Sequence, residues 1–206
     1  MRLTSEQARE NRQLILETAS RMFRLHGVED VSVADVMKQS GFTHGGFYNH
    51  FDSKEELVAE AIAYAFVKST DNLSEKFGTA KTPKKGFETV IAEYLSPGYR
   101  DSSTGGCPAA ALPSDSARNG KEVQMAFAEG IESYLDVFSA QMTGTKRESR
   151  QQAVALLSGL VGALMLSRAV KKCNPQLSDE LLHSTRKSLS NRSKTGAPQE
   201  REIYVG

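Results

Sequence analysis

The stretch from residue 43 to residue 54 gathers side chains that can recognise a large polar surface. His44 and Asn49 carry groups that can hydrogen-bond to the edges of nucleic-acid bases, and Thr43 offers a hydroxyl at the start of the stretch. Tyr48 can reach a phosphate with its phenol, and Lys54 can pair with one. The chemistry that these residues favour is therefore contact with a nucleic acid.

Two adjacent glycines, Gly45 and Gly46, interrupt a stretch that we expect to be a short helix. Each glycine inside a helix costs about 0.8–1 kcal/mol relative to alanine. Such a pair is expected where the backbone must come very close to another molecule. Lys54 falls in the first turn of the following helix, where the exposed amides and the helix dipole favour an anion. A cation there is poorly placed for helix stability and well placed for a phosphate.

The elements that must position these residues are two short helices joined by a tight turn at Ser40-Gly41-Phe42. The spacing of Val28, Val31 and Val33 could indicate a strand, but Ser32 and Asp35 form a capping-box-like pair that favours a helix start. Six apolar residues are spaced to pack inward and lock the two helices together: Val33, Val36, Met37, Phe42, Phe47 and Phe51. This is the plan of a helix-turn-helix.

The rest of the chain also has helical periodicity, and no convincing alternating strand occurs. We expect an all-α fold of about nine helices: Thr4 or Ser5 to Gly27, Ser32 to Gly41, Thr43 to Phe51, Ser53 to Phe77, Thr82 to Leu95, Ala109 to Arg118, Val123 to Phe138, Thr145 to Pro175 and, capped by Ser178, on to Leu189. Residues 96–108 are expected to form a loop because they are rich in Gly, Pro and Ser.

Composition is that of an ordinary globular protein, with 39% hydrophobic and 25% charged residues among 206. The net charge of +1 says nothing about a partner, and residues 1–60 hold seven Lys/Arg against ten Asp/Glu. Nucleic-acid binding must therefore rest on the placement of charge. No Asp or Glu occurs between Lys38 and Phe51, which is such a placement.

Cys107 and Cys173 are too few for a disulfide framework and lack the spacing of metal ligands, so we expect no metal site and no cofactor. The N-terminus has no signal peptide, and the apolar run Ala153–Ser167 is shorter than the ~20 residues of a membrane span. A cytoplasmic protein without a membrane partner is the prediction. No carboxylate pair, phosphate loop or metal cluster supports an enzyme.

Residues 32–57, SVADVMKQSGFTHGGFYNHFDSKEEL, resemble the N-terminal domain of TetR/AcrR-family transcriptional regulators. The resemblance covers about Arg12 to Ala63, and the remainder is similar only in the number and lengths of its helices. It implies a three-helix helix-turn-helix domain over residues 1–52 and a larger helical effector-binding and dimerisation domain over residues 53–190. The polar composition of residues 191–206 predicts a flexible C-terminal tail.

The resemblance implies a repressor that binds a palindromic operator in double-stranded DNA as a homodimer and answers a small-molecule effector. Thr43, His44, Gly45 and Asn49 fall where such proteins contact bases, and the backbone-contact positions are Ser32, Tyr48, His50 and Lys54. In one departure, His44-Gly45-Gly46 replaces the more usual charged or small residue followed by a single glycine. This departure bears on which base His44 contacts and not on whether the helix docks on DNA.

The segment 153–170 is apolar nearly all round and carries small residues one turn apart, Ser158, Gly159, Gly162 and Ala163. It is either a central core helix or, as in the resembled family, part of a four-helix dimer interface together with the last helix. The aromatic residues of the middle helices are mostly core, but they also suit an effector pocket. The residues that we assign to such a pocket are Phe66, Phe87, Ile91, Tyr94, Cys107, Phe127 and Tyr134.

Cys107 leaves two interpretations open. A thiol near a helix N-terminus can react with electrophiles or oxidants, which would make the protein a redox- or electrophile-responsive regulator. Most lone cysteines, however, are small buried apolar residues. Cys173 is expected to be structural. Outside this class, the alternative is a helical protein-interaction module without DNA binding, which would show no salt-dependent DNA affinity.

Overall fold

The computed structural model describes residues 4–102, 104 and 106–192. These residues form ten α-helices and one 3₁₀ helix, η1, and they contain no strand, which confirms the all-α prediction. The elements are α1 (Ser5–His26), α2 (Val33–Gln39), η1 (His44–Asn49), α3 (Lys54–Thr79), α4 (Pro83–Tyr94), α5 (Pro97–Arg100), α6 (Pro108–Ala111), α7 (Pro113–Arg118), α8 (Lys121–Ala140), α9 (Lys146–Val170) and α10 (Pro175–Arg192).

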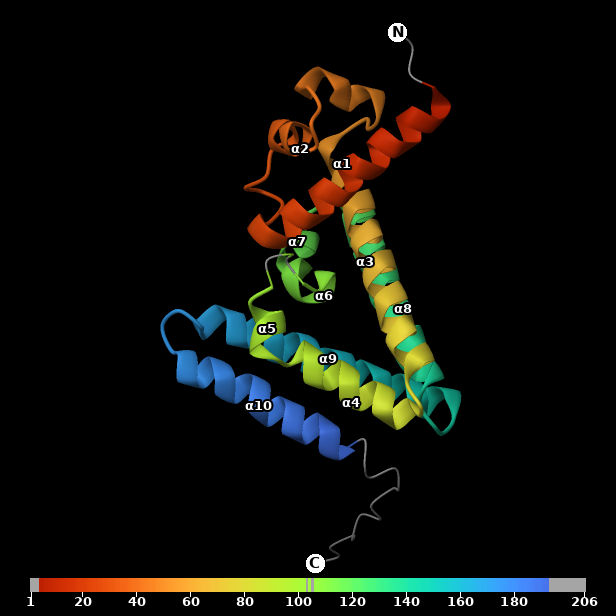
Figure 1. The fold of residues 1–206 in the computed structure, drawn as a ribbon, viewed down its shortest axis with the longest axis vertical. Helices are drawn as coiled ribbons and strands as arrows, with labels where there is room; N and C mark the ends of the chain where they lie inside the picture. The colour runs from red at the N-terminus through yellow and green to blue at the C-terminus, as the bar shows by residue number, and fades with distance from the viewer. Residues whose placement is uncertain (1–3, 103, 105, 193–206) are drawn as a thin grey trace, which may run out of the picture.

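Figure 1 shows two groups of helices at opposite ends of the molecule. Helices α1 and α2, with η1, form one end, and α4, α9 and α10 form a layer at the other end. The long helices α3 and α8 pack side by side and connect the two ends, while the short helices α6 and α7 lie beneath α1. We call the layer of α4, α9 and α10 the lower layer. It is connected to α1 by two routes, one through the long helix α3 and one through the short helices α6 and α7.

Capping explains where several helices begin. Reciprocal capping boxes start α1 at Thr4, α2 at Ser32 and α9 at Thr145. Ser53 caps α3 by accepting a hydrogen bond from the amide of Glu56 at 3.0 Å. The predicted starts of these four helices are confirmed.

Two segments that form proline-led short helices, residues 97–100 and 108–118, were not predicted correctly. Residues 97–100 form α5 within the expected loop, because Ser96 caps the turn and Pro97 occupies its first position. The single helix expected over residues 109–118 is broken at Leu112, where α6 ends and α7 begins. Pro113 has no amide hydrogen to continue the helical ladder, which accounts for the break.

The start of the last helix was also predicted wrongly. Asn174 accepts a hydrogen bond from the amide of Leu177 at 3.0 Å, so α10 begins at Pro175 and not after Ser178. Ser178 lies fully buried one turn inside the helix, where its hydroxyl donates to the carbonyl oxygen of Ser167 in α9 at 2.8 Å. The residue therefore joins two helices and does not cap one.

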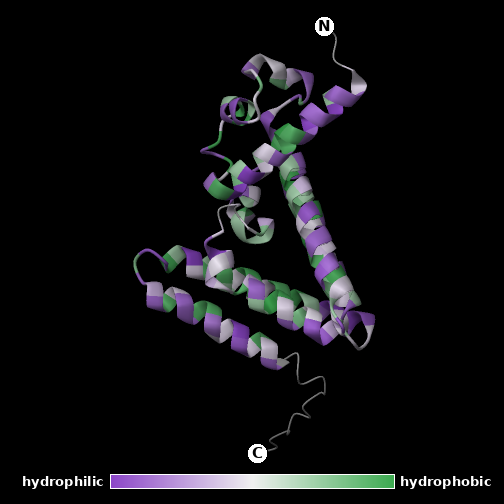
Figure 2. Cartoon of the chain, in the orientation of Figure 1, coloured by the Kyte–Doolittle hydropathy of each residue, from purple (hydrophilic) through white to green (hydrophobic). Residues whose placement is uncertain are grey.

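Helix α9 is the one helix in the described part of the chain with the length and hydropathy of a membrane span. Its inner face holds Leu156, Leu160 and Leu164, which are buried in the core against neighbouring helices. Hydrophobic residues are visible along much of this helix in Figure 2. The inner face of α9 therefore forms part of the core of the layer that α4, α9 and α10 make. Of the expected tail, residues 193–206 lie outside the described residues, and Asn191 and Arg192 end α10.

Candidate nucleic-acid interface

The turn between α2 and η1 is built as the sequence predicts. Gly41 has a φ of +83°, a conformation that favours glycine, and the amide of Phe42 donates to the carbonyl oxygen of Met37 at 2.8 Å. The rings of Phe47 and Phe51 stack with their centroids 5.6 Å apart. All six apolar residues that we expected to face inward are buried or pack against the core: Val33, Val36, Met37, Phe42, Phe47 and Phe51.

The expected third helix is a 3₁₀ helix over residues 44–49 and is shorter than predicted. Thr43, His44, Gly45 and Asn49 are exposed, and the side chain of Tyr48 is 68% exposed. In a 3₁₀ helix, residues three apart lie one above the other, so Gly45 and Tyr48 share one edge. The polar face that we expected on the outside of the protein is thus open to a partner.

The two glycines have different surroundings. A Cβ atom added at Gly45 would meet no atom within 4 Å, and its φ is not positive. A Cβ at Gly46 would lie 3.7 Å from Cε of Met37, an ordinary contact. Nothing in the described part of the chain therefore requires glycine at position 45.

Two of the expected phosphate-contacting residues have partners within the protein. The Ser32 hydroxyl donates to Asp35 Oδ2 at 2.5 Å and is engaged in capping α2. Lys54 Nζ donates to the carbonyl oxygen of Val28 at 2.9 Å. An ammonium group has three hydrogens, so Lys54 keeps two donors for another acceptor.

His50 is half-buried at the end of η1. Burial lowers the pKa of its imidazole, and the nearby Arg12 guanidinium lowers it further. The side chain is therefore neutral at neutral pH, where it can contact a phosphate as a hydrogen-bond donor and not as a cation.

Arg12 is a residue of this region for which the sequence analysis predicted no role. Its guanidinium lies 4.5 Å from the centre of the Phe51 ring, pairs with Glu60 of α3 through both terminal nitrogens, and donates from Nε to the carbonyl oxygen of His50 at 3.2 Å. Arg12 therefore joins α1, the end of η1 and α3. Because His50 and Glu60 lie 38 and 48 residues from Arg12 in the sequence, no local motif indicates these contacts.

The residues that we assigned to an effector pocket do not form a single cluster. Phe66 contacts Phe127 and Tyr134 edge to face, each at 5.3 Å between centroids, and Cys107 Sγ lies 3.5 Å from the Tyr134 hydroxyl. Phe87 lies apart from these residues, in a cluster with Phe77 and Phe138. The remaining two residues of the assignment, Ile91 and Tyr94, lie on the same helix as Phe87, α4. Phe87 thus belongs to the core at the far end of α3.

The two cysteines also differ. Cys107 is buried, with 2% of its surface exposed, which fits the apolar interpretation better than free reactivity. Cys173 is exposed in the turn after α9, so the expectation that it is a structural, packed residue was wrong.

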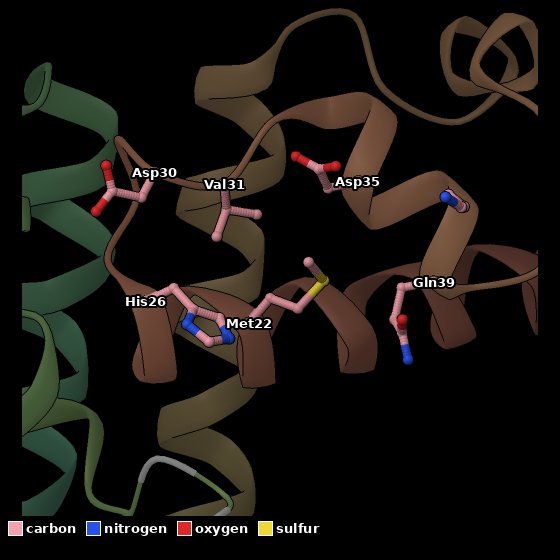
Figure 3. A pocket seen from close by; sticks show the side chains of 7 residues that line it. Met22, His26, Asp30, Val31, Asp35 and Gln39 are labelled. Atoms are coloured by element: carbon pink, nitrogen blue, oxygen red, sulfur yellow. The ribbon is translucent and has the colours of Figure 1, made fainter.

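A pocket of about 290 Å³ opens between α1 and α2, away from the expected effector residues (Figure 3). Its lining is mixed, with Met22 and Val31 beside charged or polar side chains: His26, Asp30, Asp35, Lys38 and Gln39. In the close-up, Met22 and His26 lie on α1 in the lower part of the view, and Asp30, Val31 and Asp35 lie above them. This pocket belongs to the helix-turn-helix end of the molecule.

The end of α1 is tied to the short helices beneath it. The Val28 amide donates to Asp115 Oδ1 of α7 at 2.9 Å. Arg24 Nη1 donates to the carbonyl oxygen of Gly106, just before α6, at 2.7 Å. These two hydrogen bonds connect the helix-turn-helix end to the part of the chain that holds Cys107 and Tyr134.

Comparison with known proteins agrees with this architecture. Residues 15–61 match the family described as bacterial regulatory proteins, tetR family. The chain is 27% identical over 172 residues to YxaF, an uncharacterized HTH-type transcriptional regulator of Bacillus subtilis, covering 82% of this chain and 90% of that protein. It is 22% identical to LmrA, an HTH-type transcriptional regulator of the same organism, covering 82% of this chain and 92% of LmrA.

Among solved structures, the reduced form of NemR from E. coli superposes with a TM-score of 0.76 at 16% identity, covering 88% of this chain and 96% of NemR. This likeness shows the shared fold. Both of the relatives named above are described as HTH-type transcriptional regulators. The matched helix-turn-helix, the exposed polar face and the all-α C-terminal part lead to one conclusion: residues 15–61 form a DNA-binding domain of the tetR family of bacterial regulatory proteins, and the chain is similar over most of its length to HTH-type transcriptional regulators.

Proposed function

We propose that the protein is a cytoplasmic repressor that binds a palindromic operator as a homodimer and releases it when a small molecule binds the C-terminal part. The observation that carries this proposal is the exposed face of η1. It presents hydrogen-bonding side chains around a glycine that nothing within the described protein requires.

In this proposal, Thr43, His44 and Asn49 contact base edges in the major groove, and Gly45 and Gly46 allow the backbone to approach the duplex. Four residues at the flanks contact the phosphates: Ser32, Tyr48, His50 and Lys54. Phosphate contacts hold the reading face in register, while the base contacts carry the sequence preference.

Dimerisation is supported by the uncovered outer face of α9. Only 39% of the most apolar window of this helix is buried within the protomer. Val154 and Leu166 are 44% and 57% exposed, and a Cβ at Gly162 would meet no atom within 4 Å. Leu177 of α10 adds a further exposed apolar side chain. A second copy of this face, related by a two-fold axis, would cover these residues and place two reading faces on the two halves of a palindrome.

Effector control is supported by the two hydrogen bonds that connect the end of α1 to the short helices α6 and α7. A ligand that displaces α6 and α7 acts directly on Gly106, just before α6, and on Asp115 of α7. Gly106 is the partner of Arg24 in α1, and Asp115 is the partner of Val28 in the connection after α1. Ligand and DNA must then oppose each other reciprocally, and a coupling of about 1–3 kcal/mol would change operator affinity roughly 5–150-fold.

The proposal is tested by selecting genomic fragments with the purified protein and sequencing what is bound. We expect the enriched fragments to share a two-fold symmetric motif, and their affinity to fall steeply as salt rises. Fragments without a common motif would contradict the proposal. Binding that does not depend on salt would favour the helical interaction module.

A further inference from the structure

Two arginines from distant helices converge on Gly106. Arg24 of α1 donates from Nη1 to the Gly106 carbonyl oxygen at 2.7 Å. A Cβ atom built on Gly106 would lie 2.8 Å from Nη2 of Arg168 in α9 and 3.6 Å from the ring of Tyr99. Gly106 also has a φ of +65°, a conformation that side chains rarely adopt, so a substitution there would be strained.

Neither arginine has an acidic partner in the part of the chain that the structure describes. The hydrogen bonds of Arg24 go to the carbonyl oxygens of Ser20 and Gly106, and that of Arg168 goes to the carbonyl oxygen of Arg100. By contrast, four other arginines pair with carboxylates: Arg12, Arg100, Arg118 and Arg150. Arg24 and Arg168 are both half-buried, which makes the lack of a counter-charge costly.

Burial lowers the pKa of the Arg24 guanidinium, and the nearby phenols of Tyr99 and Tyr134 only partly oppose this shift. Burial in turn raises the pKa of both phenols, so they stay neutral at neutral pH and cannot balance the charge. The cluster therefore holds positive charge that no group within the described protein neutralises.

The surroundings of this charge are aromatic. The rings of Tyr94 and Tyr99 stack with their centroids 4.9 Å apart. Among the described residues, the Tyr94 hydroxyl is buried without a hydrogen-bond partner within 3.5 Å, although the Cys107 thiol lies near enough to help raise its pKa. Tyr134 donates to Ser69 Oγ at 2.5 Å and lies 3.5 Å from Cys107 Sγ. A buried hydroxyl without a partner is unfavourable, and a ligand that accepts or donates a hydrogen bond there would relieve it.

We propose that the effector is an organic carboxylate with a flat, apolar body, whose charge is taken up by Arg24 and Arg168 and whose body lies against Tyr94 and Tyr99. This inference rests on the proposed function, because it names the chemical class of the effector. An arginine binds a carboxylate through two parallel hydrogen bonds, a geometry that a backbone carbonyl cannot offer.

The two arginines also define what the ligand would connect. Arg24 lies in the last turn of α1, next to the helix-turn-helix, and Arg168 lies in the last turn of α9, the proposed dimer helix. A carboxylate that draws the Arg24 guanidinium away from Gly106 removes one of the two ties that hold the end of α1. The same ligand is then linked to DNA affinity and to the dimer layer.

The test uses the full chain without DNA and a panel of three aromatic carboxylates, benzoate, salicylate and 2-naphthoate, each paired with its neutral amide. Thermal shift finds the carboxylates that bind, and calorimetry measures their affinity. We expect at least one carboxylate to bind and its amide not to bind. We further expect Arg168→Gln to weaken the binding at least about tenfold, as loss of one partner of a buried charge pair does.

Arg24→Gln is expected to weaken binding similarly, and Arg168→Gln keeps the test decisive if the Arg24 variant does not fold. Arg150→Gln, which removes a surface arginine paired with Glu132, serves as the matched control and should bind like the parent. Three results would overturn the inference: an amide that binds as tightly as its carboxylate, full affinity in Arg168→Gln, or no binding by any carboxylate of the panel.

Because this test contains no DNA, its outcome separates from that of the proposed function. Arginine-dependent carboxylate binding together with a failed operator selection would leave the ligand site standing and overturn the repressor. A selected operator with no carboxylate binding would do the reverse.

Discussion

Lys54 Nζ donates to the carbonyl oxygen of Val28 at 2.9 Å, and this hydrogen bond joins the first turn of α3 to the connection between α1 and α2. The amide of the same Val28 donates to Asp115 of α7 at 2.9 Å. Both backbone groups of one residue, which is 3% exposed, are therefore held by helices of the C-terminal part. Val28 is the point at which α3 and α7 together fix the helix-turn-helix.

We predict that Lys54→Met has two separate effects. Loss of the donor leaves the carbonyl of the buried Val28 without this partner, which should lower the free energy of unfolding by about 1–3 kcal/mol. Loss of the charge should weaken DNA binding equally across sequences and reduce the slope of log affinity against log salt by about one. Urea unfolding and fluorescence anisotropy measure the two effects, with the exposed Lys84→Met as control. A changed stability with an unchanged salt slope would show that Lys54 is only a structural tie.

Tyr48→Phe isolates one hydroxyl. The side chain is 68% exposed, and its hydroxyl makes no hydrogen bond within the described part of the chain, so unfolding should be unaffected. A hydrogen bond to a charged phosphate contributes about 1.5–3 kcal/mol, so operator affinity should fall roughly tenfold to a hundredfold. The loss should be the same on operator and on random DNA. Equal affinity of the variant and the parent would remove Tyr48 from the interface.

Gly45→Ala tests whether the backbone approaches the duplex closely. Because the added methyl meets no protein atom within 4 Å, we expect the fold to be kept or stabilised by up to about 1 kcal/mol. Operator affinity should nevertheless drop, which gel-shift titration would measure. Gly78→Ala in α3, where a Cβ also meets nothing within 4 Å, is the matched control and should bind DNA normally. Full affinity in Gly45→Ala would show that position 45 stays clear of the DNA.

Leu166→Glu tests the dimer. This side chain is 57% exposed on the outer face of α9, so a carboxylate there should leave the protomer folded and disrupt a hydrophobic interface. We expect light scattering to give the mass of a monomer and operator binding to weaken strongly. Met125→Glu places the same charge on a residue of α8 that is 50% exposed and should remain dimeric. A dimeric Leu166→Glu would place the interface elsewhere.

The acid stability of the lower layer should depend on Asp101. Hydrogen bonds from Arg100, and then from Lys171, lower the pKa of this carboxyl from 3.8 to about 2. A depressed pKa contributes stability that is full above about pH 4 and is lost as the pH falls toward 2. Because 36% of the side chain is exposed, the contribution should stay below about 1 kcal/mol.

The check is the difference in urea midpoint between the parent and Asp101→Asn at about pH 6, 4 and 3. The difference should be largest at the highest pH and shrink at the lowest. A difference that does not change with pH would mean that the ion pair with Arg100 is not its source.

Local sequence patterns were enough to predict much of the helix-turn-helix. The Ser32 capping box, the turn at Gly41 and the inward spacing of the aromatic residues are all short-range patterns, and the structure contains them. The 3₁₀ form of residues 44–49 was not predictable in the same way, because two glycines weaken helical preference without saying which helix results.

Long-range contacts explain what the sequence could not predict. Ser178 has the residue type of a helix cap, but the tertiary hydrogen bond to Ser167 and the side chain of Asn174 move the helix start. Phe87 was assigned to a pocket by its type, whereas packing against Phe77 and Phe138 places it in a separate cluster. The tie from Lys54 to Val28 spans 26 residues, and no spacing rule indicates it.

The proposed reading face is tested most directly by comparing the sequence preferences of three proteins: the parent, His44→Ala and Tyr48→Ala. Each is used for the same selection from random duplexes after circular dichroism has shown that it is folded. We expect Tyr48→Ala to recover the parental motif with weaker binding, and His44→Ala to recover a motif altered at one position in each half-site. Parental motif and parental affinity in both variants would contradict the docking of this face on DNA.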